Sequence, residues 1–264
     1  MANDGCKTYR VWDRPVRIFH WLNVITVLGL LGVGLIIYNG KALGISADAK
    51  LALKSAHVWI GYLMAANLAW RFSWGFVGKG FARWRAILPF GRGYLQDLNA
   101  YGQSLRGGAP RAYLGHNPLG RLMVFALLVL LTIEAATGLV LAGTDLYYPP
   151  LGSWIASWVA APGIDPASLL PGNKAMVDAA AWSDMRAFRA PYMALHEIGF
   201  YLLGGAALLH IVAVAFAEIK DCSGLVSAMI HGNKTLAGQP VDLPVAAQPR
   251  VGDVHPGEAN IRLG

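Results

Sequence analysis

The sequence has 264 residues, of which 55% are hydrophobic and 14% are charged, and its formal net charge is +7. Soluble domains carry about 25% charged residues, so most of this chain is not expected to face water. The positive charge does not indicate a nucleic-acid partner, because the Lys and Arg residues flank apolar stretches instead of lining a polar face. Cys6 and Cys222 form no C-x-x-C motif, so nothing supports a zinc ribbon or a covalently attached c-type haem.

Four stretches are long and apolar enough to cross a bilayer, which takes about 20 residues. The stretch 149–161 is too short and too rich in Pro and Gly to cross, and it predicts an interfacial turn or short helix. The N-terminal stretch is polar and lacks the pattern of a signal peptide. The sequence therefore predicts an all-α integral membrane four-helix bundle over residues 1–236 and a disordered tail, 237–264. In chain order the predicted spans are 16–38, 56–76, 119–142 and 191–218.

The Lys and Arg residues indicate how these spans are oriented. Sixteen of the 22 lie in the N-terminal segment, the connection 71–121 and the tail, and the other six lie in 39–55 and 143–190. Cytoplasmic loops carry the excess of Lys and Arg, so both termini are predicted in the cytoplasm and the loop 143–190 in the periplasm. We expect a multi-pass protein of the bacterial inner membrane, in contact with membrane lipid.

Four of the seven histidines fall inside predicted spans, where an ionisable side chain is costly and suggests a functional site. His196 and His210 are fourteen residues apart on the last span, which is about 21 Å of helix and within about 40° of the same face. His57 lies near the outer start of the second span and His20 near the cytoplasmic end of the first. The pairs predicted from these depths are His57 with His196 and His20 with His210.

Two imidazoles that face each other across a helical bundle are typical of a bis-histidine haem. Arg17 and Lys54 each precede a predicted ligand by three residues, so each could pair with a haem propionate. A lone histidine in a membrane helix is more often a hydrogen-bonding helix contact, but four at two matched depths favour two haems. A zinc or nickel site would gather its ligands at one depth.

Five segments carry a resemblance to a known family: RPVRIFHW (14–21), AHVWIGY (56–62), YLGHNPLGR (113–121), HEIGFYLLGGAALLH (196–210) and SAMIHGNKTL (227–236). The chain resembles the b-type cytochrome subunit of membrane-bound nickel–iron hydrogenases, which is related to the cytochrome subunit of formate dehydrogenase. The resemblance implies that the four histidines are axial ligands in the pairs above, and that a quinone binds beside the cytoplasmic haem. The long outer loop departs from the family pattern, so the periplasmic partner could be a hydrogenase or a c-type cytochrome.

His116 and Asn117 are the candidates for the quinone site, because a loop His–Asn pair at the membrane surface could supply a hydrogen-bond donor and a proton route. The alternative is that Asn117-Pro118 caps the third span. Glu134, in the middle of that span, could relay protons or could be a protonated carboxyl group bonded to a neighbouring helix.

The sequence predicts a membrane dihaem cytochrome that transfers electrons between a periplasmic redox protein and the quinone pool, as a subunit of a quinone-linked oxidoreductase complex. Two rivals remain. One is a self-sufficient transmembrane reductase of a small molecule or ferric ion. The other is a metal-ion or proton transporter that uses the histidines as a relay, which would lack the optical bands of reduced b-type haem.

Overall fold

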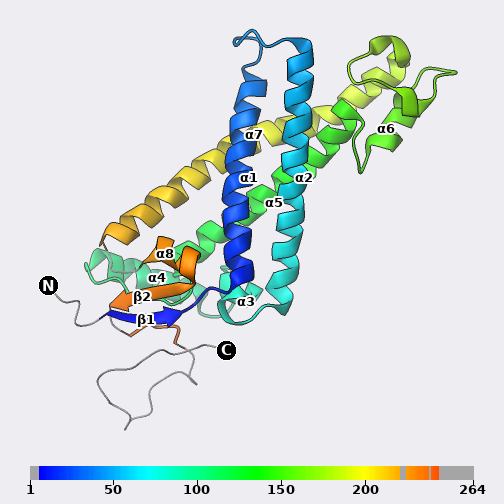
Figure 1. Ribbon diagram of the computed structural model, residues 1–264. Coiled ribbons are helices and arrows are strands. Elements are labelled where there is room, and N and C mark those ends of the chain that lie inside the picture. Colours follow the sequence, from blue (N-terminus) through cyan, green and yellow to red (C-terminus); the bar gives the residue numbers. More distant parts are fainter. Residues whose placement is uncertain (1–5, 221–223, 238, 244–264) are drawn as a thin grey trace. The chain divides into compact units, whose positions relative to one another are not determined.

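The computed structural model describes residues 6–220, 224–237 and 239–243 (Figure 1). The chain divides into two compact units. Unit 1 comprises Met1–Trp21, Ala69–Leu128 and Ala206–Gly264, and unit 2 comprises Leu22–Leu68 and Val129–Gly205. The long helices contribute to both units, and each unit is described by itself below.

Four long helices contain the predicted spans. They are α1 (Arg14–Tyr38), α2 (Ala47–Val77), α5 (Pro118–Leu146) and α7 (Ala179–Lys220). Among the described residues, α1, α5 and α7 are long and apolar enough to cross a membrane. Helix α2 is also long enough, but Lys50, Lys54, His57, Asn67 and Arg71 make it more polar, so its role as a fourth span stays a prediction.

Helix α7 begins at Ala179, well before the predicted start at residue 191. Pro191, the first residue of the predicted span, lies inside the helix. The actual start is capped by Asp178, whose Oδ1 accepts a hydrogen bond from the Ala181 N–H at 2.8 Å. The predicted loop 143–190 is therefore partly helical.

The rest of that loop forms a small apolar cluster in unit 2. It contains α6 (Gly152–Val159) and two 3-10 turns, η2 (Pro166–Ser168) and η3 (Lys174–Met176). The short helix expected within 149–161 is confirmed as α6. Ile155 and Val159 of α6 are fully buried against Met185 of α7, so this cluster anchors the early part of α7.

Unit 1 contains two features that the sequence analysis did not predict, a pair of strands and several short helices. Strand β1 (Cys6–Arg10) pairs antiparallel with β2 (Asn233–Ala237), with Thr8 opposite Thr235. The connections hold short helices: η1 (Gly80–Ala82), α3 (Trp84–Ile87), α4 (Tyr94–Arg106) and α8 (Leu225–His231). The strands are too short, and too far apart in the chain, for a local pattern to reveal them.

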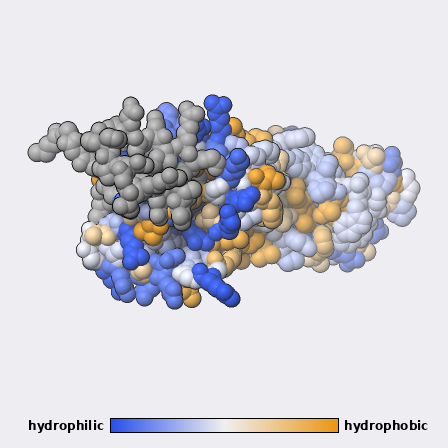
Figure 2. All heavy atoms as spheres, turned by 90° about the horizontal axis from the view of Figure 1, so that it is seen from below, coloured by the Kyte–Doolittle hydropathy of each residue, from blue (hydrophilic) through white to orange (hydrophobic). Residues whose placement is uncertain are grey.

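Part of the predicted disordered tail has a defined position in unit 1. The Asp242 carboxylate accepts hydrogen bonds from the backbone N–H groups of Leu114 and Gly115 at 2.6 and 2.8 Å. Asp242 therefore has defined partners within the predicted tail, and 244–264 lie outside the described residues. Figure 2 shows hydrophilic side chains gathered over the described part of this unit. Exposed cations there are Lys7, Arg10, Arg14, Lys79, Arg83, Arg85, Arg92, Arg106 and Arg111.

Candidate cofactor sites

Unit 2 encloses an apolar cavity of about 420 Å³ between α1, α2, α5 and α7. Its walls are mostly aliphatic and glycine residues, and Leu30, Met64, Leu139 and Phe200 are among them. This volume falls within the range of about 300–1,000 Å³ that is usual for small-molecule and cofactor sites. A cavity with this lining suits a ligand that is largely apolar.

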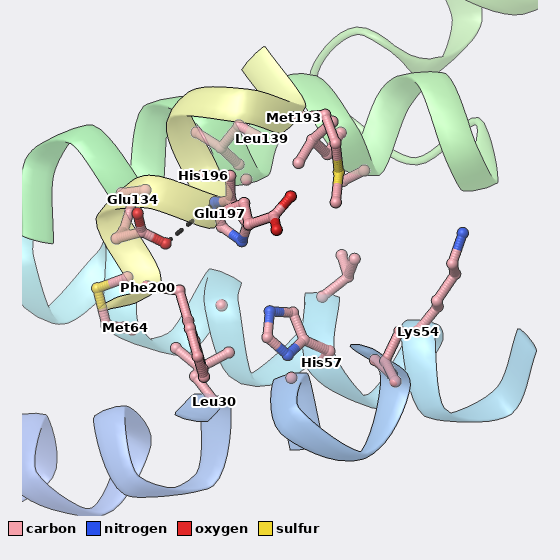
Figure 3. A pocket seen from close by; sticks show the side chains of 18 of the residues that line it. Leu30, Lys54, His57, Met64, Glu134, Leu139, Met193, His196, Glu197 and Phe200 are labelled. Carbon is pink, nitrogen blue, oxygen red and sulfur yellow. Dashed lines mark ion pairs between the residues drawn. The ribbon is translucent and has the colours of Figure 1, made fainter. Parts of the chain in front are cut away.

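His57 of α2 and His196 of α7 face each other across this cavity (Figure 3). Their ring centres are 6.2 Å apart and the rings are inclined at 77°. A metal ion held by one nitrogen of each ring at about 2 Å would place the ring centres roughly 6 Å apart. Two facing imidazoles are what an axially ligated haem uses, whereas structural zinc takes four ligands. The predicted outer pair therefore fits a haem iron.

Contacts on the far side of each ring orient the pair. His196 Nδ1 is 3.1 Å from Glu134 Oε2 and 3.0 Å from Thr137 Oγ1, both on α5. A Cβ at Gly138 would lie 3.4 Å from the His196 ring, and a Cβ at Gly34 of α1 would lie 3.4 Å from the His57 ring. Each ring is therefore held against a glycine of a neighbouring helix.

Three charged side chains form a cluster at the rim of this cavity. Asp145 of α5 pairs with Lys54 of α2 at 2.6 Å and with Arg189 of α7 at 2.6 and 3.1 Å. Lys54 also lines the cavity and pairs with Asp145 in the structure, and its pairing with a haem propionate stays a prediction. Sequence reasoning missed the cluster because it placed Asp145 and Arg189 in the outer loop 143–190. The cluster joins α2, α5 and α7.

The second predicted pair lies in unit 1. His20 and His210 are close enough to interact electrostatically. His20 Nδ1 is buried and has no hydrogen-bond partner within the described parts of the chain. Arg17 donates from Nη1 to the Ile230 carbonyl oxygen of α8. The sequence analysis did not consider Arg71 of α2 as a site residue. In the structure Arg71 is only 4% exposed, and its guanidinium carbon lies 5.3 Å from the centre of the Trp84 ring.

Asn117 caps α5, as the alternative interpretation predicted. Its Oδ1 accepts a hydrogen bond from the Gly120 N–H at 2.7 Å, and its Nδ2 donates to the Tyr101 hydroxyl at 2.8 Å. Both ends of this amide are therefore engaged in holding the start of the helix.

His116 lies close to the positively charged side chains of Lys234, Arg71 and Arg121. Its Nδ1 is buried without a hydrogen-bond partner in residues 6–220, 224–237 and 239–243, and its ring centre is 4.9 Å from that of Trp12. Burial, followed by the charges of Lys234 and Arg71, lowers the pKa of His116 to about 3. The imidazole is therefore neutral at physiological pH. It can donate a hydrogen bond through its one N–H group, but it carries no positive charge.

Facing histidines on either side of an apolar cavity, between helices long enough to cross a membrane, define a class of membrane protein that holds a cofactor between its helices. The sequence profile of the family described as prokaryotic cytochrome b561 matches residues 11–232. The chain belongs to this family, which implies a membrane-embedded helical bundle that binds b-type haem and transfers electrons.

Several curated relatives match most of the chain. A probable nickel–iron hydrogenase b-type cytochrome subunit from Rhizobium leguminosarum bv. viciae is 27% identical, over 85% of this chain and 87% of that protein. The corresponding subunit of Cupriavidus necator is 24% identical, over 89% and 90%. That of hydrogenase 1 from Escherichia coli K12 is 23% identical, over 88% and 93%. No solved structure matches. The resemblance noted in the sequence motifs is confirmed.

Proposed function

We propose that the chain binds two b-type haems and transfers electrons across the membrane between a periplasmic redox protein and the quinone pool. His57 and His196 would hold the outer haem, and His20 and His210 the inner one. The observation that carries this proposal is the separation of 6.2 Å between the His57 and His196 ring centres across an apolar cavity. When bound, haem iron supplies a one-electron change between its ferric and ferrous forms.

The residues around the outer pair supply what such a cofactor needs. The aliphatic walls make the site largely apolar, and Gly34 and Gly138 leave the imidazole rings room against α1 and α5. At the rim, Lys54 and Arg189 carry two positive charges against one on Asp145. That excess of one positive charge supports the proposal that Lys54 pairs with a haem propionate, since its ammonium group has further protons to donate. Arg17 is the equivalent candidate in unit 1.

The quinone site is proposed beside the inner pair, at His116. Its neutral imidazole has a buried nitrogen without a partner in the described chain and lies within electrostatic range of His210. A neutral imidazole can donate a hydrogen bond to a quinone carbonyl. Asn117 would act mainly by holding the loop, because its amide is occupied by the helix cap and by Tyr101.

The partner and the orientation belong to the same proposal. The relatives are named as subunits of nickel–iron hydrogenases, which favours a hydrogenase as the periplasmic partner, while a c-type cytochrome is the alternative. The exposed cations of unit 1 support a cytoplasmic position for that unit. The chain would then lie in the bacterial inner membrane with both termini in the cytoplasm.

Haem analysis of single variants tests the central claim. The purified protein is expected to contain two b-type haems per chain. His57→Ala and His196→Ala should each remove the same haem, and His20→Ala and His210→Ala the other one. His231→Ala, which changes a histidine outside the predicted spans, is the matched control and should keep both haems. A folded protein without haem, from a host that makes haem, would contradict the proposal and favour a transporter.

A further inference from the structure

Glu134 is a buried acidic residue in the apolar part of α5 and is only 9% exposed. Its Oε2 lies 3.1 Å from His196 Nδ1 (dashed line in Figure 3). Its other oxygen, Oε1, is buried without a hydrogen-bond partner among the described residues. A carboxyl group is costly in such a position, so its presence against His196 calls for a functional explanation.

The backbone of α7 is shaped to admit this carboxyl group. A methyl group at Gly199, one turn after His196, would overlap Glu134 Oε1. Glycine at this position therefore lets α7 approach the side chain of Glu134 closely. The contact between the carboxyl group and His196 therefore depends on both helices, through Glu134 of α5 and Gly199 of α7.

Two oxygen atoms of α5 surround His196 Nδ1. The Thr137 hydroxyl can donate to the carbonyl oxygen of Ile133 at 2.7 Å or of Glu134 at 3.2 Å, which leaves its oxygen available to accept from His196 Nδ1. An ionised Glu134 can only accept, so its Oε2 pairs with His196 when Nδ1 bears the hydrogen. A hydrogen on Nδ1 leaves Nε2 free to bind a metal.

We propose that Glu134 is a positioning residue that lowers the reduction potential of the outer haem through its hydrogen bond to His196. A carboxylate that accepts from the distal nitrogen makes an imidazole a more basic ligand, and its negative charge favours the ferric over the ferrous iron. This role rests on the proposed function, because it requires that His196 ligates the haem. It distinguishes His196 from His20 and His57, whose Nδ1 atoms have no partner in the part of the chain that the structure describes.

The test is a spectroelectrochemical titration of the purified dihaem protein at one fixed pH. The wild-type titration must first resolve two haems, and the outer one is assigned as the component that His57→Ala removes. Glu134→Gln keeps the size of the side chain but removes its charge. It should raise the potential of the outer haem by at least about 59 mV, which corresponds to a tenfold change in a one-electron equilibrium. The inner haem should be unchanged.

Two further variants make the test decisive. Thr137→Val removes a neutral acceptor from the same nitrogen and should shift the outer potential by less than Glu134→Gln. Gly199→Ala leaves Glu134 intact but displaces it from His196, and it replaces Glu134→Gln in the titration if that variant loses the outer haem. An unchanged outer potential in whichever of the two is titrated, or a shift as large in Thr137→Val, would overturn the inference. A wild-type protein without two haems would instead refute the proposed function.

Discussion

Replacing Asp145 by Asn is expected to loosen the packing of α2, α5 and α7 against one another. The substitution removes the negative charge that accepts from Lys54 at 2.6 Å and from Arg189 at 2.6 and 3.1 Å, and it leaves two cations beside a neutral amide. Exposed ion pairs contribute about 0.2–1 kcal/mol, whereas breaking a buried pair costs about 3–5 kcal/mol. The three side chains are 18%, 21% and 33% exposed. We therefore expect a loss of about 2 kcal/mol in the free energy of unfolding.

The assay is equilibrium unfolding in detergent micelles, followed by helical circular dichroism. The matched control is Asp184→Asn, which removes the same charge from an exposed position on α7 and should change the stability by less than about 0.5 kcal/mol. Arg189→Gln and the double variant with Asp145→Asn should show coupling, because the two residues contact each other directly. A loss in Asp145→Asn no larger than in Asp184→Asn would refute the reasoning.

Two further predictions concern the loop before α5. Burial lowers the pKa of His116 to about 3 in the folded chain, whereas the ordinary pKa of about 6.5 applies in the unfolded chain. Between these two pH values His116 is protonated in the unfolded chain but not in the folded chain. Stability should fall by up to about 1.4 kcal/mol per pH unit as the pH drops from 6.5 towards 3, and His116→Asn should flatten that part of the curve; an unaltered slope would contradict this. Asn117→Ala should cost about 1 kcal/mol through loss of the cap and leave quinone exchange nearly intact, whereas His116→Ala should slow the oxidation of the reduced haems by a quinone analogue. Stopped-flow absorbance measures that rate, and equal rates in the two variants would move the quinone site away from His116.

The positions of the long helices follow closely from the sequence, because length and apolar composition are local properties. Each predicted span lies inside a long helix of the structure. The exceptions arise where local signals conflict. The predicted fourth span begins at Pro191, but α7 begins earlier, at the Asp178 cap and the alanines that follow it. In α2, the polar side chains weaken the membrane signal although the helix is continuous.

The sequence by itself determined the helical class, the family motifs and the histidine spacing, which predicted that His57 would meet His196. The tertiary structure alone decided which side chains surround those histidines. The contact of Glu134 with His196, the Asp145 cluster and the pairing of β1 with β2 all join residues that are at least 44 positions apart in the chain. A helical period reports which residues share a face, but it does not report the register or rotation of one helix against another. From the sequence alone, a carboxyl group in a span is only known to be energetically costly to bury. The packing of the helices shows which hydrogen-bond donor it contacts.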